Sequence, residues 1–467
     1  MFLLGLALAS CAGLKPDISA SLPKDFPSVF SLYSEADSHA EAWWKSLQSH
    51  ELDLLMEKSL PENFTVLQAR ARLEQARCTA LKAGAYDYPE VTFSVSAVRQ
   101  ELHEKGEAQV SAEQWSSGFD AAYEVDLWGR VQALKGSEAE KYAASKEDVK
   151  AALMSLSEAV AQSWIELIDN RAHQDLLLKQ LALQEKLLKL IIVRFPLARA
   201  TALDIYQQQQ IVEKLRAALI PMVRNQEIIK RRLALLAGRS SLADEMLEAR
   251  SFPELTSQPV LGLPADLIAA RPDVQAAGRR LHAGEWEVAA ARADRLPALR
   301  LTASAKLSAD SLSSIFDNWI LNLAANLAGP VFDGGRRRAE VARVRAVVAE
   351  RLALYRETVL TALAEVEDAL TREAEAAATL DSLEKQLELS RQTLREARRR
   401  YLNGSSDFIN VLNEELNTLQ FEHDIISQEK QLRLARISLH VALGGSWVDE
   451  LNNAGSALKE GTAHGEN

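Results

Sequence analysis

The chain has 467 residues, with 54 Lys and Arg against 65 Asp and Glu, which gives a formal net charge of −11. This length supplies enough core for one large domain or several ordinary ones. The acidic balance argues against nucleic acid as the main partner, because phosphate-binding surfaces are basic. Two cysteines exclude a disulfide framework. Past residue 14, no uninterrupted apolar run reaches about 18 residues, the length expected of a transmembrane helix.

The first residues are typical of an export signal. The apolar stretch 2–9 is too short to span a bilayer and lies where a secretory signal has its hydrophobic region. It runs into Leu8-Ala9-Ser10-Cys11, which resembles the lipobox of bacterial lipoproteins. We therefore predict a signal peptide over 1–10, a covalent lipid on Cys11 and a lipidated segment over 11–40. A chance cysteine in an apolar N-terminus is the alternative, and no basic residue precedes the apolar stretch.

The rest of the chain is a tandem repeat. At an offset of 206 residues, Gly129-Arg130 aligns with Gly335-Arg336, and Arg194-Phe195 aligns with Arg400-Tyr401. Each half has a helix, two alternating segments, a very long helix, a break and a second long helix. Self-similarity at a fixed period predicts two copies of one structural unit. We place the first repeat at 41–250, the second at 251–447 and a mobile tail at 448–467.

Two segments in each repeat alternate apolar and polar residues, which predicts strands with one dry and one wet face. These strands are expected at about 90–104, 115–126, 298–309 and 318–331. Their lengths suit the roughly 9–11 residues of a tilted strand that crosses a membrane. Taken alone, however, the alternation favours a soluble antiparallel sheet packed on helices. The wet faces carry charges that suit a water-filled lumen: Asp120, Glu124, Arg300 and Lys306.

Two tryptophans lie near the ends of the predicted strands. Trp115 and Trp319 either sit at a membrane interface or pack at a strand end, and the sequence favours neither.

Long helices are predicted where proline and glycine are nearly absent. They are expected at about 128–194, 201–237, 335–402 and 406–443. At 1.5 Å per residue, the first and third would be on the order of 90–100 Å long. The short breaks between partners make each pair an antiparallel hairpin. Four strands cannot close on themselves, and an open edge is not viable in lipid, so a membrane role requires several chains to pool their strands. Two chains or three would both satisfy this requirement.

With these elements placed, the chain resembles the TolC/OprM-type outer-membrane efflux proteins, in the RND efflux lipoprotein (NodT-like) branch. The resemblance covers about residues 42–447. Its markers are Trp43-Trp44, Tyr123-Glu124-Val125-Asp126-Leu127-Trp128-Gly129-Arg130, Leu263-Pro264-Ala265-Asp266-Leu267, Arg271-Pro272-Asp273-Val274, Pro330-Val331-Phe332-Asp333-Gly334-Gly335-Arg336 and Ala442-Leu443-Gly444-Gly445-Ser446-Trp447.

The resemblance implies an α+β fold built as a homotrimer. Twelve transmembrane strands would form one barrel in the outer membrane, and twelve long helices a periplasmic α-barrel, with a small mixed equatorial region. It implies a passive duct, without enzymatic activity, that carries drugs or other toxic small molecules from the periplasm or pump to the exterior. The expected partners are a periplasmic adaptor (membrane-fusion) protein, an inner-membrane pump of the RND type and outer-membrane lipid. Besides the lipid on Cys11, no cofactor, metal or nucleic acid is expected.

The resemblance implies that the breaks between the long helices form the periplasmic tip, which in this family is both the gate and the adaptor contact. The family's Leu-Asp-Val-Leu-Asp pattern appears here as Ile409-Asn410-Val411-Leu412-Asn413, so both acidic positions are amides. Glu414 and Glu415 follow and would restore charge if they faced the lumen. The first break keeps Leu203-Asp204. The resemblance thus implies gate residues Asp204, Asn410, Asn413 and Glu414, and adaptor contacts Arg199, Ala200, Thr201, Gly404 and Ser405. For Asn410, a solvated helix position is an equally good interpretation.

Gly334-Gly335 precedes three arginines but lacks the spacing and the Lys-Ser/Thr ending of a phosphate loop. We interpret it as a strand-to-helix turn with Asp333 as the N-cap.

The competing function is that of a wholly periplasmic or soluble coiled-coil adaptor or scaffold, whose strands would form a small sheet in water. Fractionation of membranes without detergent separates the two classes.

Overall fold

The computed structural model describes residues 42–102, 110–243, 247–255 and 271–444. These residues divide into two compact units. Unit 1 takes 71–147 and 275–358, and unit 2 takes the remaining described residues. The predicted signal peptide, Cys11 with its lipidated segment, the marker Leu263–Leu267 and the predicted tail all lie outside the described residues.

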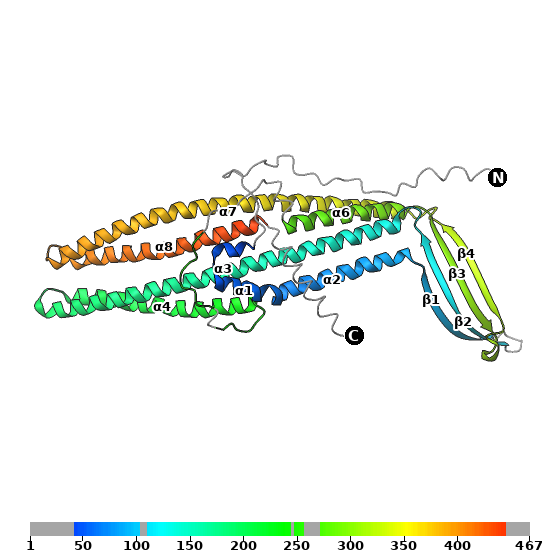
Figure 1. Ribbon diagram of the computed structural model, residues 1–467, viewed down its shortest axis with the longest axis horizontal. Coiled ribbons are helices and arrows are strands. Elements are labelled where there is room, and N and C mark those ends of the chain that lie inside the picture. The colour runs from blue at the N-terminus through cyan, green and yellow to red at the C-terminus, as the bar shows by residue number, and fades with distance from the viewer. Residues whose placement is uncertain (1–41, 103–109, 244–246, 256–270, 445–467) are drawn as a thin grey trace. The chain divides into compact units, whose positions relative to one another are not determined.

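Unit 1 contains an antiparallel sheet in the order β1-β2-β3-β4 (Figure 1). The strands are β1 (Glu90–Leu102), β2 (Val110–Val125), β3 (Ala298–Ala309) and β4 (Trp319–Ala328). The register places Phe93 opposite Phe119, Phe119 opposite Ala305, and Ala305 opposite Leu321. Residues of odd number therefore share one face across all four strands, as the period-two pattern predicts. β1 and β4 are the edges of the sheet.

Two strand boundaries differ from the predicted ones. β2 begins at Val110 rather than near 115, because β1 continues to Leu102 and the register pairs Leu102 with Val110. β4 ends at Ala328 rather than near 331, since Gly329 and Pro330 follow and proline has no N–H for the ladder.

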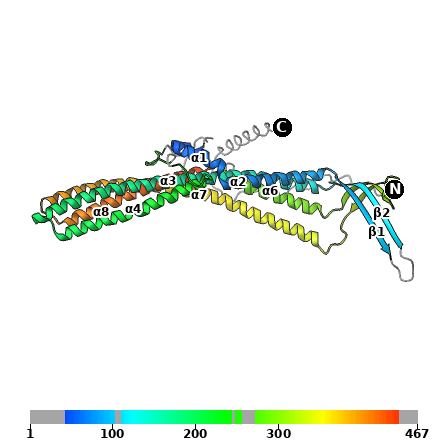
Figure 2. The same ribbon diagram turned by 90° about the horizontal axis from the view of Figure 1, so that it is seen from below.

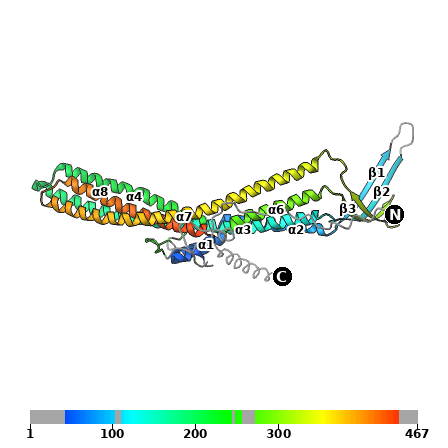
Figure 3. The ribbon, with the colours of Figure 1, turned by 90° about the horizontal axis from the view of Figure 1, so that it is seen from above.

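The helical part of unit 1 comes from α2 (Phe64–Gly84), α6 (Pro272–Ala293) and the first turns of α3 (Arg130–Arg194) and α7 (Arg336–Leu402). α3 and α6 lie side by side (Figure 3) and approach closely, because small residues meet at their contact. Ala133 packs on Ala289 and Ala290. A Cβ at Gly136 would lie 2.8 Å from the ring of Trp286, so only glycine fits there without a shift.

The turn before α7 is built around Asp333. Its carboxylate accepts hydrogen bonds from the backbone N–H of Gly335 at 3.0 Å and of Arg337 at 3.2 Å. Asp333 therefore caps the helix with its side chain, as predicted, but the N-cap position itself is Gly335, because α7 starts at Arg336. Arg337 would oppose the helix dipole in the first turn, and it pairs with Asp294 at 3.2 Å.

Unit 2 contains two helical hairpins (Figure 2). The first joins α3 (Arg130–Arg194) to α4 (Ala202–Leu236), and the second joins α7 (Arg336–Leu402) to α8 (Phe408–Ala442). The order α2-β1-β2-α3-α4 recurs as α6-β3-β4-α7-α8, as the repeat predicts. None of the described helices combines the length and the apolar composition needed to cross a bilayer.

Aromatic residues fix the short N-terminal elements of unit 2 to the hairpins. Trp43, in the turn Trp43–Leu47, donates to the Ser157 hydroxyl at 3.2 Å and stacks on His440, with ring centroids 5.7 Å apart. α1 (His50–Glu62) supplies Glu51, which accepts a hydrogen bond from the indole of Trp164 at 2.7 Å. The Trp43-Trp44 marker is thus a core element, and both of its side chains are buried.

Candidate functional site

The polar face of the sheet carries charges that pair across neighbouring strands. Lys306 Nζ lies 3.0 Å from Asp120 Oδ1, and Arg300 Nη2 lies 3.9 Å from Glu124 Oε2. Arg130, at the start of α3, adds a second contact to Glu124 at 2.8 Å. These residues all have even numbers along the strands, so they share the face opposite the apolar one. The wet face predicted from the sequence is confirmed, and its charges neutralise each other locally.

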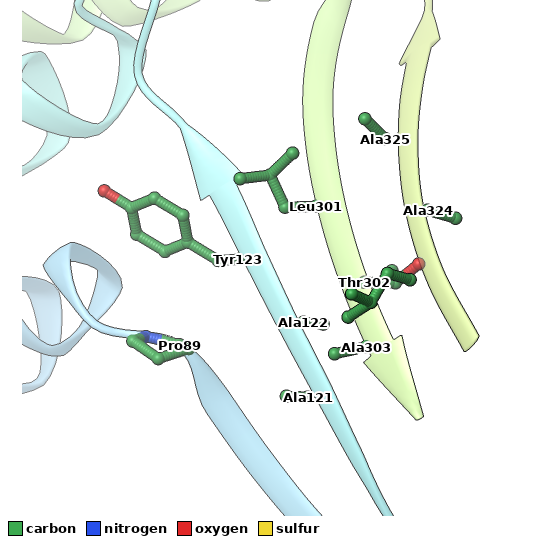
Figure 4. Close-up of a pocket in the computed structure, with 10 residues that line it drawn as sticks. Pro89, Ala121, Ala122, Tyr123, Leu301, Thr302, Ala303, Ala324 and Ala325 are labelled. Carbon is green, nitrogen blue, oxygen red and sulfur yellow. The ribbon is translucent and has the colours of Figure 1, made fainter. Parts of the chain in front are cut away.

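The other face of the sheet is apolar and open. The rings of Phe93 and Phe119 touch across β1 and β2, with centroids 5.0 Å apart. Leu323 on β4 is 75% exposed, which would be costly for an apolar side chain facing water. A hollow of about 480 Å³ opens on the sheet and is lined by Tyr123, Leu301 and alanines of β2, β3 and β4. Figure 4 shows these alanines near the neighbouring side chains of Tyr123 and Leu301. No charged residue of the described chain lines this hollow.

The apolar face ends at a level marked by tryptophan. Trp115 pairs with Ala97 and Ala309, and Trp319 pairs with Leu307 one level closer to the helices. Beyond Trp115, the same face carries Arg99 and Glu113, which form an ion pair at 3.3 Å. Both tryptophans therefore sit at the border between an apolar band and a charged rim, which favours the interfacial interpretation over end packing.

At the first tip, Asp204 closes a capping box. Its carboxylate accepts from the backbone N–H of Thr201 at 2.8 Å, and the Thr201 hydroxyl accepts from the Asp204 N–H at 3.2 Å. Arg199 is exposed and Ala200 is half-buried beside them. Ala198 holds the turn with φ 53°, a left-handed conformation that favours glycine. The structure thus gives Asp204 a structural role in starting α4, and the gate role stays a prediction.

At the second tip, Gly404 takes the left-handed conformation with φ 75°. Ser405 donates its hydroxyl to the backbone carbonyl of Arg400 at 3.1 Å. The Asn410 amide donates to the Ser406 hydroxyl at 2.9 Å, and Asn413 is exposed. Within the described chain, no hydrogen bond joins Asn410 or Asn413 to Asp204.

The two glutamates that follow differ in environment. Glu414 is half-buried, whereas Glu415 is buried and pairs with Arg398 at 2.7 Å. Glu415 lies three and four residues after the buried Leu412 and Val411, so it continues their helical stripe. The prediction that Glu415 could restore charge in the lumen did not use this spacing, although the spacing is visible in the sequence. Glu415 therefore contributes nothing to an exposed acidic ring.

Apolar and aromatic contacts hold the two tips together. One cluster of buried residues comprises Ile191, Leu394, Phe408, Val411 and Leu412. Tyr401 packs on Phe408 with centroids 5.2 Å apart, and the Arg194 guanidinium lies 4.8 Å from the centre of the Tyr401 ring. Burial raises the pKa of the Tyr401 phenol.

A titratable cluster joins α3 to α8 farther from the tips. The rings of His173 and His423 lie 4.3 Å apart, and Asp169 contacts both His173, at 3.2 Å, and Lys430, at 3.1 Å. Burial opposes protonation of His173, but its hydrogen bonds to Asp169 outweigh burial and raise its pKa. Burial and the charge of His173 lower the pKa of His423. His173 is therefore the more readily protonated of the two rings, and His423 the less readily protonated. In the described chain, no set of three His, Cys, Asp or Glu residues is placed to hold a metal ion.

Comparison with known proteins gives a consistent result. The sequence matches the outer membrane efflux protein family over residues 55–239 and 263–445, one match in each repeat. It is 33% identical to the pyoverdine export outer membrane protein OpmQ of Pseudomonas aeruginosa, over 95% of this chain and 96% of that protein. It is 30% identical to the outer membrane protein OprJ of the same organism, over 86% of each chain. Among solved structures, the outer-membrane channel OprN superposes with a TM-score of 0.86 at 26% identity, over 93% of this chain and 99% of that one.

Proposed function

The chain belongs to the outer membrane efflux protein family and is an outer-membrane component of an efflux system, and from this membership we propose that it works as a trimeric, passive duct. Solutes would move along the polar face of the sheet and down a lumen between the long helices. The proposed cargo is the broad class of small molecules, drugs and other toxic compounds, that a coupled pump delivers. The name of one relative refers to pyoverdine export, which makes pyoverdine a further candidate cargo to test.

The observation that supports association of several chains is the open, two-faced sheet. Among the described residues, no strand pairs with the outer edges of β1 and β4, and such open edges are not tolerated in lipid. Pooling the strands of several copies pairs every edge and turns all polar faces toward one lumen. We propose three copies because the family resemblance implies that number.

The tips of the hairpins are the proposed gate and adaptor contact. We propose that a periplasmic adaptor protein binds at Arg199–Thr201 and at Gly404 and Ser405, and that an inner-membrane pump of the RND type supplies the cargo. The exposure of Arg199, Thr201, Gly404 and Ser405 supports this assignment.

A covalent lipid on Cys11 is proposed as the anchor of the N-terminus in the outer membrane. The support is the lipobox-like sequence that ends at this cysteine. Cys11→Ser should abolish metabolic labelling of the protein with a radioactive fatty acid, and labelling that persists would exclude this site.

The mass of the purified, detergent-solubilised protein tests the duct. We expect three times the 51.5 kDa of one chain, after the detergent contribution is subtracted. A single chain recovered from the soluble fraction without detergent would instead support the coiled-coil adaptor or scaffold.

Conductance in planar bilayers tests the gate assignment. Asp204→Lys reverses the charge at the first tip and should lower the preference for cations. Asp204→Asn separates charge from capping, since asparagine keeps the acceptor oxygen. Unchanged ion selectivity in both variants would remove Asp204 from the gate.

A further inference from the structure

A groove of unit 2 lies between α3, α7 and α8 near the tips. It encloses about 580 Å³, within the roughly 300–1,000 Å³ of pockets that hold drug-sized molecules. Half of its lining residues are leucine or isoleucine, among them Leu176, Leu183, Leu387, Leu394 and Ile425. An α-helix is about 10–12 Å across with a pitch of 5.4 Å, so little more than one helical turn fits. The groove therefore suits a small molecule better than a partner helix.

One polar atom in this groove lacks a partner. Glu415 lines the groove with a side chain only 4% exposed. Its Oε1 accepts a hydrogen bond from Arg398 at 2.7 Å, whereas its Oε2 is buried and receives none. Leaving a buried carboxylate oxygen without a donor is costly. A ligand that donates a hydrogen bond to this atom removes that cost.

The cations of the groove are already engaged or lie in solvent. Arg391 pairs with Glu422 at 2.9 Å, and Arg398 is held by Glu415 itself. Lys179 is exposed at the rim. The cations of the groove therefore need no further acceptor. What the groove lacks is a hydrogen-bond donor for Glu415 Oε2.

We propose that this groove binds a small organic amine. Its apolar body packs against the leucines, and its protonated nitrogen donates to Glu415 Oε2. An ammonium is the best donor, since charge-assisted hydrogen bonds are roughly twice as strong as neutral ones. The proposal concerns residues of a single chain and is tested separately from the duct proposed above.

Binding of 9-aminoacridine, a fluorescent aromatic amine, tests this site in the full-length protein in detergent. Anthracene-9-carboxylate has the same ring shape but an anionic group, and we expect it not to bind. Glu415→Gln keeps the side-chain shape and removes the charge. This variant should raise the dissociation constant of 9-aminoacridine by about tenfold or more. Leu183→Trp fills the groove from a position that is 44% exposed and should also weaken binding at least about tenfold. Leu178→Trp is the matched control, because Leu178 is 47% exposed on the same helix and does not line the groove.

The outcomes are distinguishable. Weaker binding in Glu415→Gln and Leu183→Trp, with wild-type affinity in Leu178→Trp and unchanged melting curves, supports the proposal. Equal affinity in the wild type and Glu415→Gln overturns it, since the dye then binds micelles or apolar surface. No binding to the wild type also overturns it. A loss of oligomers in Leu183→Trp alone shows that a second copy occupies the groove, and this too overturns it.

Discussion

The two hairpins of unit 2 are related by the 206-residue repeat, yet their tips are stabilised in different ways. Leu412 in α8 is 7% exposed, whereas its repeat equivalent in α4, Tyr206, is 68% exposed. Phe408 is buried, and its equivalent, Ala202, is exposed. The second hairpin therefore supplies most of the apolar core at the tips, and the first supplies mainly Ile191.

Local interactions show the opposite distribution. Thr201 closes a capping box at the start of α4, whereas its equivalent, Asp407, makes no side-chain capping hydrogen bond. The left-handed turn residue is Ala198 in the first tip and Gly404 in the second. A repeated architecture thus keeps its geometry while burial stabilises one copy and hydrogen bonding the other.

The largest expected difference concerns burial. Leu412→Ala should lower the free energy of unfolding by about 2–5 kcal/mol, because it leaves a cavity in the tip cluster. Tyr206→Ala should change it by no more than about 0.5 kcal/mol, as for other exposed positions. Chemical denaturation of the detergent-solubilised protein measures both. Equal losses would mean that the tips are equally buried in solution.

The acid sensitivity of the hairpins should also differ. Burial, and next the charge of Arg436, lower the pKa of His440 to about 4 from an ordinary value of 6.5, while its repeat equivalent is the non-titrating Ala234. Between these two pH values the unfolded chain binds more protons than the folded one, so stability falls as the pH drops. The loss should reach about 3 kcal/mol near pH 4, and stability is fully retained above about pH 6.5.

His440→Phe is the control for this effect. It keeps a ring to stack on Trp43 and removes the titrating group. Thermal unfolding at a series of pH values should therefore show a smaller acid-dependent loss in this variant. Identical pH profiles for the two proteins would contradict the assignment to His440.

Exchanging the turn residues tests how the left-handed backbone conformation affects the stability of each tip. Gly404→Ala should destabilise the second tip by about 1–2 kcal/mol, the cost of the left-handed conformation for a residue with a Cβ. No atom lies within 4 Å of the added Cβ, so a steric clash contributes nothing. Ala198→Gly should stabilise the first tip by up to about 1 kcal/mol, since relief of strain exceeds the added chain entropy. Hydrogen exchange of the tip amides reports both changes, which must have opposite signs.

The smallest expected effect is that of capping. Thr201→Ala removes the capping box and should cost about 1 kcal/mol, whereas Asp407→Ala should cost about 0.5 kcal/mol or less, because only a favourable dipole interaction is lost. Limited proteolysis of the two tips gives the ranking. The ranking is refuted if protease cleaves the second tip of Asp407→Ala faster than it cleaves the first tip of Thr201→Ala.

Several features of the fold followed from the sequence. Alternation at period two identified all four strands and the sharing of one face by Phe93, Phe119 and Leu321. The near absence of proline and glycine identified the long helices, and Asp333 was identified as a cap from its place before Gly334-Gly335. These features depend on near neighbours in the chain, where backbone geometry alone sets which residues share a face or end a helix.

The tertiary structure decided which residues meet. Period two limits the register only to steps of two residues, so the pairing of Glu124 with Arg300, and the early start of β2, had to come from the observed ladder. Rotation of α8 about its own axis decided that Glu415 is buried on Arg398 while Glu414 is not. Such rotations depend on packing between residues far apart in sequence. The sequence therefore determined the elements and their dry faces, and only packing determined which charges are paired and where a buried acceptor is left open.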